Sequence, residues 1–571
     1  MTARETAERP NGARTRRPGR VGSVFLAGAV AFAAACSSGD EDAPEGPWWE
    51  QAGPGQDLPV DDPDAARFLT QATFGPTMSE MTGLNFAGFD AWFAYQRSLP
   101  PTQQRPRLQA RAAAGQDLFK NQRQEEWWRA VVRGEDQLRQ RMAFALSEIF
   151  VISDEAGALG NQILGVAEYY DMLSRHALGN YRELLEDVSK SPAMGRYLSH
   201  LGNRKLDPET GIRPDENYAR EIMQLFTIGL IELNSDGTPR LDNSMLEIPT
   251  YDQTDIEELS RVMTGWTYGG ATRFNNAQAN FLRPMEPWDE FHDDGAKTIV
   301  GDALLVAGLT AEEDLDAALD VLFEHPNTGP FISRRLIQRL VTSNPSPEYI
   351  QRVATVFADD GEGVRGNLYA VARAILMDDE ARSGHLTSPT TFGMVREPLV
   401  RLAGLWRFFN GTAQTGRFRY SNPENDFEQA ALRSPTVFNF FEPDYAPPGE
   451  VADAGLVAPE MQITTHTSVT KVANEFRDRI LNAYPGRSNN NEHTVVLNLD
   501  DELALADDPA ALIDHLDLYL MSGQMSNQMR TALIDHVTST ELDAGNKADG
   551  MQRVLDAIYL IVTSPEGAIQ L

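Results

Sequence analysis

Apolar residues recur at helical spacing along most of this chain of 571 residues, and this periodicity constrains the fold more than any other feature. Between residues 367 and 382 the apolar side chains fall at i, i+3, i+4, i+7 and i+8, which places them on one stripe of a helix. Residues 331–341 repeat the spacing with arginines in between, so they predict a buried helix with a basic outer face. Residues 137–152 show a similar pattern.

Strand patterns are few by comparison. Residues 297–306 predict a small β-hairpin, and residues 494–499 predict one short strand. Three segments that are polar or rich in Pro and Gly, residues 241–254, 411–425 and 446–459, predict long loops. We therefore predict an all-α fold, mainly helical with one or two minor β-hairpins.

The length of the chain exceeds what a single hydrophobic core usually supports. We expect one large, mostly α-helical domain over residues 63–571, with room for two lobes. The chain has a single cysteine, Cys36, so no disulfide can form within it. The folded domain therefore lacks a thiolate for catalysis, iron–sulfur ligation or zinc binding.

The first 36 residues have the pattern of an export signal. Arginines are followed by an apolar run over residues 21–35, which is shorter than the roughly 20 residues of a membrane-spanning helix. The end of this run, Ala33-Ala34-Ala35-Cys36, resembles a bacterial lipobox, in which the cysteine is acylated and becomes the new N-terminus. Ala33 departs from the leucine that is usual there. We predict a lipoprotein signal peptide over residues 1–36 with lipidation at Cys36; the alternative is an ordinary signal peptide that is cleaved nearby.

The residues after Cys36 predict the membrane to which the lipid anchors the protein. Ser37 and Ser38 are typical of lipoproteins destined for an outer membrane, so we expect anchoring there rather than at an inner membrane. Residues 37–62 are rich in Asp, Glu, Pro and Gly and cannot bury much surface. They predict a disordered tether between the lipid and the domain.

The formal net charge of −33 restricts the partners of this domain. Such an acidic chain repels the phosphates of nucleic acids and anionic membrane surfaces, so we expect no nucleic-acid partner. The charge suits cations, basic partners or simply solubility outside the cell.

Common catalytic signatures are missing from the sequence. It contains no G-x-S-x-G elbow, no H-E-x-x-H zinc helix and no Walker-type loop. Residues 361–366 match G-x-G-x-x-G, but they follow a helical pattern, and the preceding Asp359 and Asp360 would repel a pyrophosphate. We interpret this segment as a loop between helices.

Residues 215–229, DENYAREIMQLFTIG, form the first candidate site. Asp215 suits a helix N-cap and Gly229 a helix end. In a helix Asn217, Arg220, Glu221 and Gln224 share one face. This face is either solvated or held in a structural ion pair, or it lines a cleft and orients a ligand.

Residues 288–297 form the second candidate site. His292, Asp293 and Asp294 lie together, and imidazole and carboxylate groups are ligands for a divalent metal such as calcium, manganese or zinc. The alternative is a structural turn at Asp294-Gly295, which His292 would cap.

The third candidate site is residues 434–445, where aromatic side chains stand among prolines. They suit either a platform on which a carbohydrate stacks or, as we favour, packing in the core.

These segments, in order, resemble a bacterial family catalogued only as domain of unknown function 1800. The resemblance extends from about Pro63 to the end of the chain, and its most specific motif is DENYAREIMQLFTIG. The other matching segments are residues 66–77, 141–150, 179–185, 264–266, 292–297, 331–336, 344–347 and 396–401. The resemblance implies an exported protein, often encoded beside a second exported, sulfatase-like family. It implies no reaction, so no catalytic residue is carried over.

Two functions remain open at this stage. The first, which we favour, is a lipid-anchored envelope component that binds or assembles with an exported protein or a polysaccharide. The second is a metal-dependent hydrolase of an extracellular polymer, using the His292 segment together with Arg220 and Glu221. A carboxylate-pair glycosidase is a further possibility, but among 83 acidic residues the sequence nominates no pair.

Overall fold

The described part of the chain is built from helices, and this confirms the predicted all-α fold. The computed structural model describes residues 46–484, 490–539 and 548–571. The predicted signal peptide with Cys36, the two serines after it and the first part of the predicted tether lie outside the described residues. None of the described helices is both long and apolar enough to cross a membrane.

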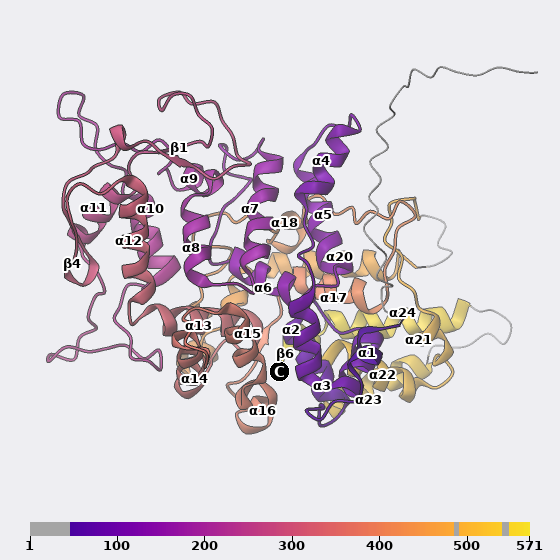
Figure 1. The fold of residues 1–571 in the computed structure, drawn as a ribbon. Coiled ribbons are helices and arrows are strands. Elements are labelled where there is room, and N and C mark those ends of the chain that lie inside the picture. The colour runs from indigo at the N-terminus through magenta and orange to yellow at the C-terminus, as the bar shows by residue number, and fades with distance from the viewer. Residues whose placement is uncertain (1–45, 485–489, 540–547) are drawn as a thin grey trace, which may run out of the picture. The chain divides into compact units, whose positions relative to one another are not determined.

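The first helices of the chain lead up to the motif DENYAREIMQLFTIG (Figure 1). They are α1 (Trp48–Ala52), α2 (Asp62–Ala72), α3 (Met78–Ser98), α4 (Arg105–Ala113), α5 (Lys120–Arg133), α6 (Gln137–Ser147), α7 (Ile163–His176), α8 (Tyr181–Ser189) and α9 (Pro192–Tyr197). The motif itself forms α10 (Asn217–Glu221) and the π-helix η1 (Ile222–Thr227), and it ends at Gly229 with φ 70°. Asp215 stands one residue before the helix cap, where its carboxylate accepts a hydrogen bond from the Asn217 N–H at 2.9 Å.

The middle of the chain contains two of the predicted amphipathic helices. Its helices are α11 (Gln253–Val262), α12 (Ala311–Glu324), α13 (Thr328–Leu340), α14 (Pro347–Ala358), α15 (Leu368–Met377) and α16 (Asp379–Thr387), with the short 3-10 helices η2 (Asp289–Phe291) and η3 (Val300–Asp302). The single stripe predicted over residues 367–382 is divided at Asp378, which has extended backbone angles and caps α16 through the Glu380 N–H. The glycine-rich residues 361–366 connect α14 and α15 as a loop, as expected.

The last third of the described chain contributes α17 (Pro398–Phe408), α18 (Pro423–Phe427), α19 (Glu450–Asp453), η4 (Pro459–Ile463), α20 (His466–Ile480), α21 (Asp500–Ala504), α22 (Pro509–Met521), α23 (Asn527–Ser539), α24 (Ala548–Thr563) and η5 (Glu566–Ala568). The predicted loops over residues 411–425 and 446–459 are interrupted only by α18 and α19. The early helix α2 contacts the late helix α22, and both lie in the same region of Figure 1.

Strands are confined, among the described residues, to three small antiparallel sheets of two strands each. They are β1 (Trp266–Thr267) with β2 (Glu286–Pro287), β3 (Lys297–Ile299) with β4 (Ala303–Leu305), and β5 (Met394–Val395) with β6 (Ile569–Gln570). The pair β3–β4 confirms the predicted hairpin, and Gly301 supplies the turn with φ 72°. The strand predicted over residues 494–499 is wrong, because Val496 makes only an isolated bridge to Thr412.

One main core runs through the described residues after Gly46, from Ala65 to Val562. At its centre, Trp128 of α5 meets Trp127 with ring centroids 4.8 Å apart and Trp406 of α17 at 5.0 Å. Aromatic side chains of this size bury large apolar areas, so the contact of Trp128 with Trp406 holds together α5 and α17, which are distant in the sequence.

Part of the predicted tether belongs to the folded unit. Residues 48–52 form α1, and the Trp48 ring stacks on Tyr95 of α3 with centroids 5.3 Å apart. Two adjacent tryptophans, Trp48 and Trp49, give this acidic stretch enough apolar surface to pack against α3, as the contact of Trp49 with Gly83 shows.

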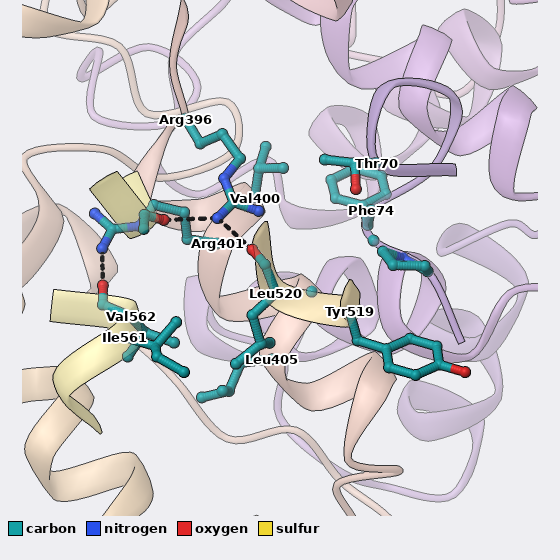
Figure 2. A pocket seen from close by; sticks show the side chains of 14 residues that line it. Thr70, Phe74, Arg396, Val400, Arg401, Leu405, Tyr519, Leu520, Ile561 and Val562 are labelled. Atoms are coloured by element: carbon teal, nitrogen blue, oxygen red, sulfur yellow. Dashed lines mark hydrogen bonds between the residues drawn. The ribbon is translucent and has the colours of Figure 1, made fainter. Parts of the chain in front are cut away.

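Arg396, just before α17, and Arg401 of α17 form hydrogen bonds with the C-terminal helices. Arg396 donates from Nη2 to the carbonyl oxygens of Leu520 at 2.9 Å and Gly567 at 2.6 Å, and Arg401 donates to that of Val562. Figure 2 shows both guanidinium groups directed at these oxygens. Leu520 and Val562 lie in the last turns of α22 and α24, where the helix dipole favours a cation. Burial lowers the pKa of both arginines, and the charge of Arg396 lowers that of Arg401 further. The cavity beside them, about 30 Å³, holds no more than a few water molecules.

Replacing Arg401 tests these contacts. We expect Arg401→Met to reduce the free energy of unfolding by about 1–3 kcal/mol, because the carbonyl end of α24 loses a charged donor. Urea denaturation followed by circular dichroism measures the change. Arg477→Met is the matched control, since its partner Asp478 is also exposed and a surface pair contributes little. Equal midpoints for the two variants would contradict the assignment.

Candidate functional site

His292 lies in a buried cluster of charged residues. Its side chain is 1% exposed, with Nε2 2.9 Å from Asp314 Oδ2 and Nδ1 3.0 Å from the Thr264 carbonyl oxygen. Asp314 lies in α12 and also pairs with Lys297 of β3. Lys297 Nζ donates in addition to the carbonyl oxygens of Asp293 and Gly295. Both ring nitrogens of His292 therefore already have partners.

The two carboxylates beside His292 point elsewhere. Asp293 accepts from Arg261 Nη2 at 2.9 Å and Nε at 3.0 Å. Burial raises the pKa of Asp293, but the hydrogen bonds and charge of Arg261 outweigh it, so the pKa lies below its usual value. Asp294 is exposed. Within the described ranges, no group of three or more His, Cys, Asp or Glu side chains is placed to hold a metal ion. The contacts of His292, Asp293 and Asp294 are those of a structural cluster.

The predicted face of the motif helix is divided by the π-turn. Arg220 pairs with Glu216 at 3.4 Å on the surface, and Asn217 is exposed. Glu221 is buried, and its Oε2 has no hydrogen-bond partner among the residues that the structure describes. Burial raises the pKa of Glu221 against the opposing charge of Arg220. Only Gln224, one turn further in η1, reaches a cleft. The wider π-turn rotates Gln224 away from the face that an α-helix would have given it.

This cleft has a volume of about 550 Å³ and is the candidate functional site. Three segments form its walls: the loop that follows η1, the arginine face of α13, and residues 437–444. The side chains that line it include Ile149, Gln224, Leu225, Leu230, Ile231, Leu233, Phe331, Arg334, Arg335, Arg339, Val437, Phe438, Glu442 and Asp444. A mostly apolar cleft with a few polar groups is typical of a ligand site.

The aromatic segment contributes one ring to the cleft. Phe438 is 46% exposed and lines the wall, whereas Phe440 and Phe441 pack with Ile463 in a small core of their own. Core packing therefore accounts for most of this segment. Phe438 and Phe331 are the two aromatic rings of the walls.

Three arginines of α13 bring positive charge into the cleft. Arg335 donates to Asp444 at 3.2 Å, while Arg334 lies 3.8 Å from the same carboxylate. The Arg339 side chain is 7% exposed and lies over the Phe441 ring, and its Nε is 3.5 Å from Glu148 Oε2. In the part of the chain that the structure describes, its guanidinium donates no hydrogen bond. The N–H groups of a guanidinium that has no hydrogen-bonded acceptor can donate to a ligand.

Glu148 forms the floor of the cleft at the end of α6. Its side chain is 2% exposed, and its Oε1 accepts from the amides of Gln429 and Asn439, both at 3.3 Å. Gln429 also donates to Glu397, which precedes α17. Burial and the neighbouring Glu397 hold the pKa of Glu148 well above its usual value.

Sequence reasoning missed Glu148, Glu397 and Arg339 as site residues. Glu148 interrupts the apolar run FALSEIF, and an acidic residue within such a run was the available signal. Glu397 and Arg339 carry no comparable signal, because only folding brings α6, α13 and α17 together.

Replacing Asp314 tests whether the His292 cluster is structural. We expect Asp314→Asn to cost about 3–5 kcal/mol of unfolding free energy, because it leaves Lys297 buried without its counter-charge. Asp320→Asn on the same helix is the control; its carboxylate is 67% exposed and pairs with Arg182 at the surface, so about 1 kcal/mol or less is expected. Guanidinium denaturation compares the two. A small loss for Asp314→Asn would rule out the structural role.

Comparison with known proteins identifies the family of the chain. No curated protein and no solved structure matches it. The family model described as "Protein of unknown function (DUF1800)" matches residues 67–568. This range contains the cleft, the His292 cluster and almost every described helix. The chain therefore belongs to the DUF1800 family of proteins of unknown function.

Proposed function

We propose that this protein is an exported, lipid-anchored component of the bacterial cell envelope whose cleft binds a ligand with an anionic group. The observation that carries the proposal is Arg339, which is buried in the cleft and donates no hydrogen bond within the described residues. Its guanidinium forms an ion pair with Glu148 at 3.5 Å, and its N–H groups can donate to a carboxylate, sulfate or phosphate on a ligand.

The surrounding charge makes this cationic wall selective. The chain as a whole carries a formal charge of −33, yet three arginines of α13 stand side by side along the cleft. Long-range repulsion slows the approach of free anions, so the arginines suit a ligand that also makes apolar contacts. The rings of Phe331 and Phe438 and the nearby leucines supply such contacts, which a peptide or the apolar faces of a sugar would use.

Binding of simple anionic probes tests the proposal. We expect a sulfated polysaccharide such as heparin, and inorganic sulfate more weakly, to bind with an affinity that falls as salt rises, while neutral dextran does not bind. Arg339→Gln should weaken heparin binding about tenfold or more, since one charged hydrogen bond is lost. Isothermal titration calorimetry measures the affinities.

The control is Arg530→Gln, which removes a surface arginine paired with Asp514 outside the cleft. Equal binding by the Arg339→Gln and Arg530→Gln variants would contradict the proposed cleft. So would binding of dextran as tight as that of the anionic probes.

The envelope location is supported by the sequence pattern that ends at Cys36. Export and an acyl group on this cysteine, with the outer membrane as destination, would hold the cleft at the surface of a membrane by a short linker. An exported partner of the sulfatase-like kind implied by the family resemblance remains a prediction.

Metabolic labelling tests the anchor. In a bacterial host given an alkyne analogue of palmitate, the full chain should incorporate the label and fractionate with membranes. Cys36→Ser should lose both properties, because only a thiol accepts the lipid. Unlabelled wild-type protein, or label retained in Cys36→Ser, would exclude lipidation at this residue.

The alternative, a metal-dependent hydrolase that uses His292 with Arg220 and Glu221, has less support. His292 has partners on both ring nitrogens, and Arg220 pairs with Glu216 at the surface. Metal dependence stays a prediction. Stoichiometric metal in the purified protein that is lost in His292→Ala would restore it.

A further inference from the structure

We propose that a cluster of arginines on α4, α5 and the loop between α17 and α18 binds the phosphate groups of anionic phospholipids, so that this face of the protein lies on a membrane. The inference goes beyond the cleft, and it rests on the proposed lipid anchor only for bringing a membrane within reach. The arginine cluster consists of five arginines around two glutamates: Arg107, Arg111, Arg129, Arg417 and Arg419 with Glu125 and Glu126.

Two buried carboxylates of α5 lie at the centre of the arginine cluster. The side chains of Glu125 and Glu126 are each 1% exposed. Glu126 Oε2 accepts from Nε of Arg107 at 2.8 Å and from Nε of Arg129 at 3.0 Å. Arg111 bridges the two carboxylates, 2.9 Å from Glu125 and 2.6 Å from Glu126. Because a buried carboxylate needs such partners, the arginines are held at fixed positions.

The loop between α17 and α18 adds two arginines to the cluster. Arg417 Nη2 lies 2.6 Å and 3.0 Å from the two oxygens of Glu125, and Arg419 Nε donates to the same carboxylate at 3.2 Å. Phe418, between the two arginines, is buried and packs on Trp406 with ring centroids 5.7 Å apart. This contact fixes the loop, so both arginines are held beside α5.

The cluster carries a local positive charge on an acidic protein. Its five arginines and two glutamates leave an excess of three positive charges. In the first turn of α4, Arg105 lies 3.0 Å from Glu168, which Arg175 also contacts at 2.8 Å, so a further positive charge is in excess there. Salt screens exposed charges over about 10 Å, so the local charge of a face decides what it contacts. With a net charge of −33, the chain approaches an anionic surface favourably only through a face of this kind.

Three of the arginines keep hydrogen-bond donors for a ligand. Arg107, Arg129 and Arg419 contact the glutamates through Nε, and among the described residues their terminal amino groups donate no hydrogen bond. None of these three side chains is buried. The two terminal amino groups of a guanidinium match two oxygens of a phosphate. The buried glutamates therefore orient three guanidinium groups that can each bind a phosphate.

An exposed aromatic ring beside the cluster favours a lipid surface over a soluble anion. Phe119 immediately precedes α5, about two helical turns before Glu126, and is 60% exposed. In segments that lie on membranes, an apolar side chain enters the boundary of the acyl chains while cationic side chains contact the headgroups. Phe119 and the cluster supply both kinds of contact on neighbouring turns of one helix.

The proposed anchor joins the domain close to α5. Residues 37–47 separate Cys36 from α1 and reach at most about 40 Å, at about 3.5 Å per residue. Trp48 of α1 stacks on Tyr95 of α3, and the Tyr95 hydroxyl donates to Glu135 at 3.4 Å, two residues beyond the end of α5. An acyl group on Cys36 would therefore keep a membrane within reach of the cluster.

Vesicle flotation tests this surface without the lipid anchor. The chain from Ser37 onward contains the whole compact unit that begins at Pro47, and it lacks the signal segment and Cys36. We expect it to float at low salt with phosphatidylcholine vesicles that contain about one third phosphatidylglycerol, and to bind less as salt rises. It should not float with pure phosphatidylcholine.

A triple variant removes the excess charge of the cluster. In Arg107→Gln, Arg129→Gln and Arg419→Gln together, Arg111 and Arg417 remain to neutralise the two buried carboxylates. Each arginine near an anionic membrane surface strengthens binding about fivefold, so the triple variant should bind the anionic vesicles about 100-fold more weakly.

The control is a second triple variant with the same net charge. Arg240→Gln, Arg477→Gln and Arg530→Gln remove three exposed arginines of surface ion pairs outside the cluster. This variant should bind nearly as the wild type does. Equal weakening in the two triple variants would overturn the surface, because net charge alone would then explain the binding.

A fluorescent label decides the question if the first triple variant fails to fold. The chain from Ser37 onward has no cysteine, so an environment-sensitive dye can be attached to Phe119→Cys, or to Leu386→Cys as the control. Leu386 is exposed in α16, which lies in a different region of Figure 1 from α4 and α5. With anionic vesicles the dye at position 119 should brighten and shift to the blue, and the dye at position 386 should not change. No change at position 119 would overturn the surface.

The proposals fail separately. Arg339→Gln should float with anionic vesicles as the wild type does, because Arg339 lies in the cleft. Wild-type protein that takes no lipid label, while the chain from Ser37 floats, would support the surface and reject the anchor. Lipid labelling without flotation of the chain from Ser37 would keep the anchor and overturn the surface. If inorganic phosphate at constant ionic strength released the protein from the vesicles, the cluster would bind soluble phosphate, and the membrane surface would be overturned.

Discussion

Burial of the Glu148 carboxyl group is the constraint on which the cleft depends. This one side chain, at the end of α6, has Arg339 of α13 and the amides of Gln429 and Asn439 as its partners. A carboxyl group away from water is costly unless such partners are present, so the helices that carry them are held at fixed positions. The same arrangement leaves Arg339 and Glu148 with unused hydrogen-bonding atoms that face a cleft of about 550 Å³.

A second buried network of charged residues surrounds His292. In the His292 cluster, Asp314 meets Lys297 and His292 at the start of α12, and both imidazole nitrogens have partners. This network lies away from the walls of the cleft and joins α12 to the hairpin β3–β4. The two networks differ in how many of their hydrogen-bonding atoms have partners. In the His292 network nearly all donors and acceptors bond to one another, whereas in the Glu148 network several have no partner among the described residues and could bind a ligand.

The segments that carry the family resemblance can now be located relative to the cleft. The most specific motif, residues 215–229, does not form the floor of the cleft. It packs through Tyr218 and Phe226, ends in a π-turn, and offers Gln224 and the following loop as one wall of the cleft. Residues 141–150 and 396–401 contain the two carboxyl groups, and residues 331–336 contain two of the arginines. Segments spread over the whole chain thus meet at one cleft, which is consistent with a family model that spans residues 67–568.

The sequence by itself determined the helical fold, the hairpin at β3–β4 and the family, because periodicity, turn residues and motifs are local properties of the chain. It also singled out the α13 arginines, the helix with Gln224 and the aromatic segment, though as separate features. At His292, ligand-type residues lie adjacent in the sequence, and in the structure His292 and Asp293 contact different partners. Only the tertiary structure decided the pairing of Glu148 with Glu397, which are 249 residues apart (397 − 148). The two carboxyl groups share the amide of Gln429 as a donor. Hydrogen bonds depend on distances of a few ångströms, and no sequence spacing encodes such a distance between helices that meet only on folding.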